Sequence, residues 1–194
     1  RLTIISSYFV PTKDGVNTLV ELAEAGIDIK ILTNSFDATD VTAVHSGYSQ
    51  WRPSLLRAGV KIYELKTTAS EEKRENKLWK ARSQSSTSLH AKTFAVDDYQ
   101  VFIGSYNVDP RSANINTEMG VIINDEELAK QLHSALSDEL LGQAYEVKLL
   151  ENGSLQWHTV EAGEKVVYDS EPRVDISDHV WLSIMSWLPI DWLL

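Results

Sequence analysis

One histidine and one lysine stand two residues apart inside a short apolar stretch, SLHAKTFAVD at residues 88–97. Because side chains alternate in direction along a strand, His90 and Lys92 point to the same face, and Asp97 follows five residues after the lysine. A His beside a Lys at the start of a strand makes a cationic pocket that suits a phosphoryl group. The imidazole can attack phosphorus or deliver a proton, and the ammonium stabilises the charge that develops on the phosphoryl oxygens.

A second polar group follows at the end of the next apolar run. Gly104 lets the backbone approach a ligand closely, and Ser105 and Asn107 both offer hydrogen-bond donors. Since residues 100–105 read as the returning strand of a hairpin, we expect this group to come back beside His90. The sequence therefore predicts that two separate sets of polar side chains converge at one place.

The surrounding sequence predicts the elements that would position these residues. Apolar β-rich runs alternate with stretches of helical spacing that end at glycines, and a hairpin, a further strand and an acidic helix follow. The predicted strands lie at 2–10, 27–35, 61–65, 92–97, 100–105 and 116–124. The predicted helices lie at 14–27, at 40–60 in two pieces interrupted by Pro53, and at 125–142. This order predicts an α/β protein with a mostly parallel, mixed β-sheet flanked by helices. We expect a surface loop over 66–88.

Composition and charge narrow the function classes. The net charge is −10, and the chain has no cysteine, which excludes disulfides and thiolate metal sites. Residues 1–119 hold 14 basic and 14 acidic side chains, whereas residues 120–194 hold 4 and 14, so no broad basic face for nucleic acid is expected. No apolar run approaches the roughly 20 residues that cross a bilayer. The chain opens with Arg1 directly before a buried strand, so we expect a piece of a longer protein.

The correlated pattern H-x-K-x4-D, G-S-x-N, D-x-R-S and N-x-E resembles the phospholipase D superfamily, and within it the bacterial cardiolipin synthase-like branch. The match rests on His90, Lys92, Asp97, Gly104, Ser105, Asn107, residues 109–112 and residues 116–118. The resemblance implies a phospholipase D-type half domain over residues 1–145. Residues 146–194 then form an appended β-hairpin and a short Trp-rich amphipathic helix, which we expect to dock on the domain rather than to anchor it in a membrane interface.

The resemblance also implies a mechanism. In this family two such motifs act together: one His forms a phosphohistidine, and the other protonates the leaving alcohol and then activates the acceptor. Carried over to this chain, His90 is one of the two catalytic histidines, Lys92 and Asn107 bind phosphate, and Ser105 lines the site. Glu118 is expected to fix a histidine tautomer, Asp97 is structural, and neither a metal nor another cofactor is required.

This sequence departs from the family pattern because it holds one such motif. No other histidine is followed by Lys two residues later; His45 is a possible substrate-pocket residue, and His133 is expected on the surface of the acidic helix. The expected partners are a missing N-terminal half or a second copy of the chain, together with phosphatidylglycerol and a second phospholipid. We expect a cytoplasmic or peripheral inner-membrane protein. The alternatives are a homodimeric phosphodiesterase or endonuclease and an inactive half-domain.

Overall fold

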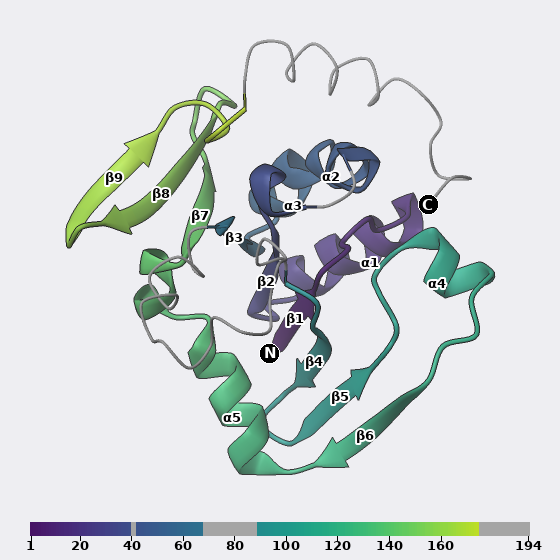
Figure 1. The fold of residues 1–194 in the computed structure, drawn as a ribbon. Helices are drawn as coiled ribbons and strands as arrows, with labels where there is room; N and C mark the ends of the chain where they lie inside the picture. Colours follow the sequence, from purple (N-terminus) through teal and green to yellow (C-terminus); the bar gives the residue numbers. More distant parts are fainter. Residues whose placement is uncertain (40–41, 68–88, 175–194) are drawn as a thin grey trace, which may run out of the picture.

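The computed structural model describes residues 1–39, 42–67 and 89–174, which build one mixed β-sheet with helices against both of its faces (Figure 1). Its strand order is β6-β5-β4-β1-β2-β3-β7-β8-β9. The strands are β1 (Leu2–Ser6), β2 (Ile29–Asn34), β3 (Lys61–Leu65), β4 (Lys92–Val96), β5 (Gln100–Gly104), β6 (Gly120–Asn124), β7 (Ala144–Leu149), β8 (Leu155–Glu161) and β9 (Glu164–Tyr168). The predicted α/β class, a mixed sheet flanked by helices, is confirmed.

Parallel pairing is restricted to the middle of the sheet. β1 pairs with β2, and β2 with β3, in parallel, while the remaining neighbours pair antiparallel. The sheet is therefore less parallel than the sequence predicted, because the hairpins on either side of the β1-β2-β3 unit need no crossover helix. The C-terminal strands β7, β8 and β9 extend the same sheet beyond β3.

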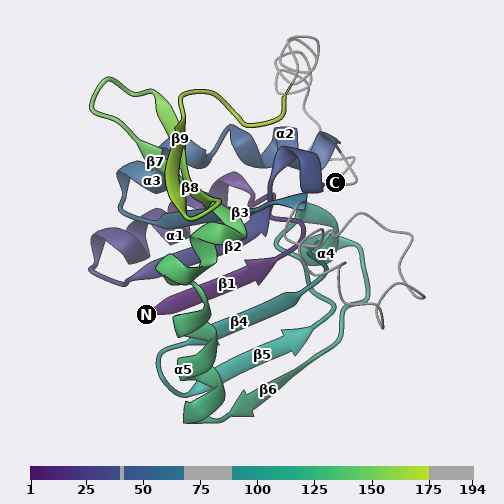
Figure 2. The same cartoon turned by 60° about the vertical axis from the view of Figure 1, so that its left-hand side comes forward.

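Helices cover the two faces unequally (Figure 2). They are α1 (Lys13–Glu24), α2 (Thr42–Ser49), α3 (Arg52–Arg57), α4 (Pro110–Asn114) and α5 (Glu126–Ala135), with short 3-10 turns η1 (Phe36–Ala38) and η4 (Asp138–Gly142). The first three helices pack on one face around a large apolar cluster that includes Ile4, Ile31 and Leu55. Helix α5 packs on the opposite face over Ala95 and Val101.

Capping residues explain where the longer helices begin. The Thr12 hydroxyl accepts a hydrogen bond from the Gly15 amide at the start of α1, and the Asp125 carboxylate accepts one from the Leu128 amide at the start of α5. The chain leaves α1 through Gly26, whose φ of 91° an L-residue rarely adopts. The helix predicted over 125–142 stops earlier, at Ala135, and η4 follows it.

The β4-β5-β6 meander places two glycines opposite one another. Gly104 pairs with Gly120, and a Cβ atom on either glycine would overlap the Phe102 ring. The Phe102 ring in turn stacks on Phe94 with centroids 5.2 Å apart. The two glycines are therefore required by packing inside the sheet, in addition to any approach of a ligand.

His133 corrects an expectation drawn from the sequence. It was expected on the surface of the acidic helix, but it is buried: its Nδ1 lies 2.7 Å from Thr3 Oγ1, and its Nε2 lies 2.5 Å from the Asp97 carbonyl oxygen. The imidazole thus ties α5 to β1 and to the turn after β4. The loop predicted over 66–88, beyond its first two residues, and the Trp-rich tail lie outside the described residues.

Candidate active site

One edge of the sheet carries His90, Lys92, Ser105 and Asn107 of the predicted motif. β1 and β2 end there, and β4 begins there because Lys92 pairs with Ser6 in antiparallel register. β5 runs antiparallel to β4, so its last residue, Gly104, returns to the same edge. The convergence that the hairpin prediction implied is therefore the arrangement seen.

A chain of hydrogen bonds joins three segments at this edge. Lys92 Nζ donates to Ser7 Oγ over 3.3 Å, and Ser7 Oγ donates to Asn107 Oδ1 over 3.1 Å. Lys92 Nζ also lies 3.4 Å from the His90 carbonyl oxygen. Because these contacts are long for a charged donor, the ammonium can exchange them for oxygens of an anionic ligand.

The His90 side chain is exposed, and its backbone is held by a neighbouring strand. Asn34, the last residue of β2, accepts from the Leu89 amide over 2.8 Å and donates to the Leu89 carbonyl over 3.3 Å. The same amide nitrogen donates to the Ser7 carbonyl. Asn34 therefore fixes the approach to His90 and the end of β1 together, while the imidazole remains open to a ligand.

Ser105 and Glu118 form the rim of the site. Ser105 Oγ donates to Glu118 Oε2 over 2.5 Å, and the Met119 amide donates to Ser105 Oγ over 3.0 Å. Hydrogen bonds from Ser105 and Ser112 lower the pKa of Glu118, so it is a carboxylate at neutral pH. Desolvation lowers the pKa of Lys92, against the opposing effect of Glu118 and Asp109.

Asp97 lies away from this edge, at the turn between β4 and β5. It has a φ of 48°, and its carboxylate contacts the Arg1 amino group over 2.8 Å. Asp97 thus lies at the opposite end of β4, and the structural role expected for it stays a prediction. Sequence reasoning missed Ser7 and Asn34; their signal was a polar residue directly at the end of each of two buried strands.

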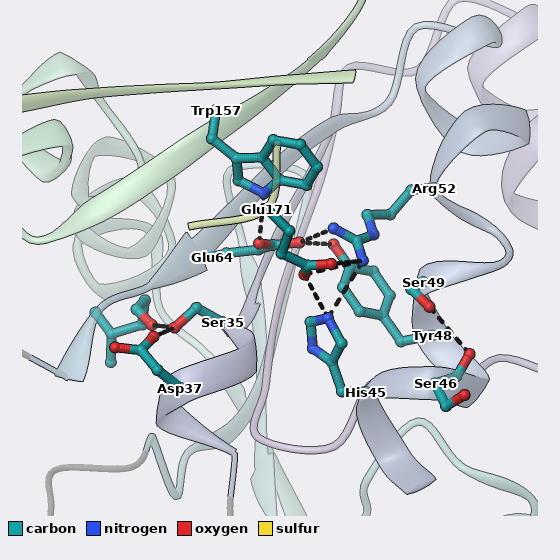
Figure 3. Close-up of polar contacts among 11 residues, drawn as sticks. Ser35, Asp37, His45, Ser46, Tyr48, Ser49, Arg52, Glu64, Trp157 and Glu171 are labelled. Atoms are coloured by element: carbon teal, nitrogen blue, oxygen red, sulfur yellow. Dashed lines mark hydrogen bonds and ion pairs between the residues drawn. The ribbon is translucent and has the colours of Figure 1, made fainter. Parts of the chain in front are cut away.

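His45 belongs to a separate, buried ion network (Figure 3). Its Nε2 lies 2.5 Å from Glu171 Oε1, and Arg52 contacts both Glu171 and Glu64, at 3.0 and 3.2 Å. Tyr48 and Trp157 donate to the two oxygens of Glu64, each over 2.9 Å. The exposed fractions of His45, Arg52 and Glu64 are 1%, 2% and 0%, so these three side chains offer no surface to a substrate in the described structure.

Charge compensation keeps Arg52 and Glu171 ionised. Burial works to lower the pKa of Arg52, but the Glu64 and Glu171 carboxylates raise it further than burial lowers it. Burial likewise works to raise the pKa of Glu171, and Arg52 and His45 overcome it and bring that pKa to about 2. Sequence reasoning could not find these pairs, because Glu171 lies 119 residues from Arg52 along the chain.

The open edge presents side chains of the kinds that bind an anion. It combines one exposed imidazole, a partly exposed ammonium and the hydroxyl and amide groups of Ser7, Ser105 and Asn107. Over the residues that the structure describes, no three His, Asp or Glu side chains gather as metal ligands would. No described helix is long and apolar enough to span a bilayer.

Solved structures share this fold. A phospholipase D family member, Nuc, from Salmonella typhimurium aligns with a TM-score of 0.53 at 18% identity, over 76% of this chain and 81% of that one. The phosphatidylserine synthase of Haemophilus influenzae Rd KW20 aligns with a TM-score of 0.56 at 17% identity, over 76% of this chain and 34% of the other. The chain therefore has a phospholipase D-type fold.

Sequence relatives define the family more narrowly. A family model described as cardiolipin synthase, PLD-like domain, matches residues 1–140. Cardiolipin synthase C of Escherichia coli (strain K12) is 42% identical over all 194 residues, which cover 41% of that relative, and cardiolipin synthase 2 of Bacillus anthracis is 31% identical over 137 residues, or 71% of this chain and 23% of that relative. The chain belongs to the cardiolipin synthase, PLD-like domain family. It spans less than half the length of these two relatives.

Proposed function

We propose that this chain supplies one of two phosphate-handling motifs to a phosphatidyltransferase that makes cardiolipin. The observation that carries the proposal is the single edge at which His90, Lys92 and Asn107 meet, in a chain that is 42% identical to a cardiolipin synthase over its whole length. The substrates would be phosphatidylglycerol and a second phospholipid. The working protein would be cytoplasmic or bound peripherally to the inner membrane.

The proposed reaction runs in two steps. One motif histidine attacks phosphorus and forms a P–N bond, while the P–O bond to the leaving alcohol breaks and the second histidine gives that alcohol a proton. The hydroxyl of phosphatidylglycerol then loses its proton to the second histidine and attacks phosphorus, which frees the first histidine. Lys92 and Asn107 would bind the phosphoryl oxygens, and Ser105 would line the pocket.

Two residues would orient the site without touching phosphorus. Glu118 is a carboxylate on the rim, and we assign it to hold a histidine of the second motif in one tautomer. Asn34 would hold the backbone before His90 through its two hydrogen bonds to Leu89. His45 would support the fold from its buried ion network, so the early expectation of a substrate-pocket role is replaced by a structural one in this proposal.

A second motif must come from outside this sequence, because one histidine cannot be both nucleophile and leaving-group acid in one step. A further half of the same protein or a second copy of the chain could supply it. Light scattering of the 194-residue chain, combined with a phosphodiesterase assay, separates these cases. Turnover by a dimer indicates a second copy; an inactive monomer indicates a further half.

His90→Asn in the full-length protein tests the proposal. Cardiolipin formation from phosphatidylglycerol vesicles is expected to fall by about 10³-fold or more, the order seen when a nucleophile or acid is removed. His158→Asn is the matched control, since His158 lies on β8 and contacts Gln156. Cardiolipin formation that survives in His90→Asn at the wild-type rate would overturn the assignment. Cleavage of DNA in place of lipid would favour the endonuclease alternative.

A further inference from the structure

An apolar groove of about 340 Å³ runs beside the candidate active site. Residues of β1, of α1 and of the chain from Tyr106 to Ala113, which leads from β5 into α4, line this groove. Most of its lining is apolar, including Leu2, Ile4, Val10, Leu19, Tyr106 and Val108. The exposed fraction of Leu22, on the α1 wall, is 37%, so the groove reaches the surface along α1.

The groove and the phosphate-handling edge share one short segment of chain. Asn107 accepts from Ser7 on the side of Lys92, while its neighbours Tyr106 and Val108 line the groove. This shared segment is held firmly, because the Val10 amide donates to the Val108 carbonyl over 2.6 Å. A molecule that has a phosphate at Lys92 and hydrocarbon attached to it would meet the groove within one residue of Asn107.

The charged residue on the groove wall, Asp109, is paired with Ser112. Its two carboxylate oxygens accept from the Ser112 amide over 2.7 Å and from Ser112 Oγ at 3.5 Å. An apolar chain in the groove would therefore leave this carboxylate paired as it is. Hydrocarbon that enters the groove would gain from burial along its length.

Gly15, the third residue of α1, lies on the α1 wall of the groove. Its φ is not positive, and a Cβ atom would make only ordinary contacts of 3.5 Å with Pro11 Cβ and Thr12 Oγ1. Both neighbours also line the groove. A long side chain at position 15 would extend among these lining residues and narrow the groove.

We propose that this groove holds an acyl chain of the phospholipid whose phosphate binds at Lys92. The inference rests on the proposed function and adds to it a binding site for the hydrocarbon part of the substrate. Glycine at position 15 keeps the groove wide, and the shared segment around Asn107 sets the distance between phosphate and chain. Thr18 and Leu22 continue the same wall along α1.

Gly15→Phe in the full-length protein tests this site, with Asn17→Phe as the matched control. Asn17 is exposed on the same helix, so that variant adds an equal ring outside the groove. For dioleoyl phosphatidylglycerol in detergent micelles, Gly15→Phe is expected to lower kcat/KM about tenfold, chiefly through KM, as when two buried methylene groups are displaced. For the chain-free substrate bis(p-nitrophenyl) phosphate, both variants are expected to stay within twofold of wild type.

The two substrates also separate this inference from the proposed function. If wild type cleaves bis(p-nitrophenyl) phosphate but leaves phosphatidylglycerol unchanged, the proposed function fails. If wild type acts on both, and Gly15→Phe slows both equally or neither, the groove assignment fails while the proposed function stands. Equal melting temperatures of the two variants, followed by circular dichroism, establish that both fold.

A binding measurement gives a readout besides activity. Phosphatidylglycerol with a diazirine at the end of one acyl chain is photolysed with the protein, and the labelled peptides are identified by mass spectrometry. Label in residues 10–22 or 106–113, lost in Gly15→Phe and retained in Asn17→Phe, is the expected result. Label confined to other segments would overturn the groove assignment.

Discussion

Two histidines of this chain stand in opposite surroundings. His90 projects from the sheet edge into solvent, next to a lysine with two long contacts, whereas His45 is buried against Glu171 in a network that also pairs Arg52 and Glu64. The buried groups have used most of their hydrogen-bonding capacity on one another. The exposed groups keep hydrogen-bonding capacity free for a ligand, as a binding site requires.

The difference teaches how to separate functional from structural charge in this fold. A buried ion network is strongly destabilising when one partner is removed, because the remaining charge is left without compensation. An open cationic edge costs little to remove, since water takes the place of the lost group. Stability measurements therefore distinguish the two regions without any substrate.

Arg52→Met should give the largest effect on stability. It leaves Glu64 and Glu171 buried without their shared cation, so we expect a loss of about 3–5 kcal/mol in the free energy of unfolding. Urea denaturation followed by circular dichroism measures it. Arg57→Met, on the exposed side of the same helix, is the control and should change stability by less than about 0.5 kcal/mol. Equal effects of the two variants would contradict the role assigned to the network.

Glu171→Gln should give a smaller effect that depends on pH. The folded pKa of Glu171, about 2, lies below its ordinary value of 4.5, so the carboxylate stabilises the fold above pH 4.5 and loses that contribution as pH falls toward 2. We expect wild type to exceed the variant by about 3 kcal/mol at pH 7 and the gap to close on acidification. Urea midpoints from pH 7 down to pH 2 test this; a gap independent of pH would refute it.

Asn34→Ala should lower both stability and activity, because Asn34 is buried and also holds the backbone next to His90 at the open edge. The variant leaves the Leu89 amide and the Ser7 carbonyl without this partner, which costs about 1–3 kcal/mol, and it loosens the approach to His90. Cardiolipin formation should therefore fall together with stability. Asn34→Asp, which retains an acceptor for the Leu89 amide, should recover part of both. Full activity in Asn34→Ala would argue against a positioning role.

Lys92→Met should have the smallest effect on stability, less than about 0.5 kcal/mol, while it abolishes transfer. Among the described residues the lysine makes two hydrogen bonds, both long, so its removal leaves no buried charge there. Lys66→Met is the comparison at the same edge. Lys66 is buried, pairs with Glu161 and lies over the Tyr145 ring, so it should cost more. A destabilisation of Lys92→Met as large as that of Lys66→Met would erase the contrast between open and buried cations.

The local sequence pattern predicted where the hairpin residues of the motif lie, but it did not predict the distant contacts that hold the surrounding elements in place. The hairpin returned Asn107 to the side of Lys92, because β4 and β5 are close in sequence. The shared face of His90 and Lys92 stays a prediction, since β4 begins at Lys92. The burial of His133 depends on Thr3, 130 residues away, and the partner of Arg52 depends on Glu171. Such contacts are set by which elements pack together, which one sequence does not show.

The opposed glycines Gly104 and Gly120 bear on how the motif itself is read. A bulkier residue at Gly104 would collide with the Met119 carbonyl and the Phe102 ring before any substrate arrived. In a saturation scan of G-S-x-N, total activity would therefore fall for two different reasons. Substitutions at the glycine would lower the amount of folded protein, and substitutions at the asparagine would lower turnover per folded molecule. Dividing activity by the amount of folded protein would separate the motif positions that the fold requires from those that the reaction requires.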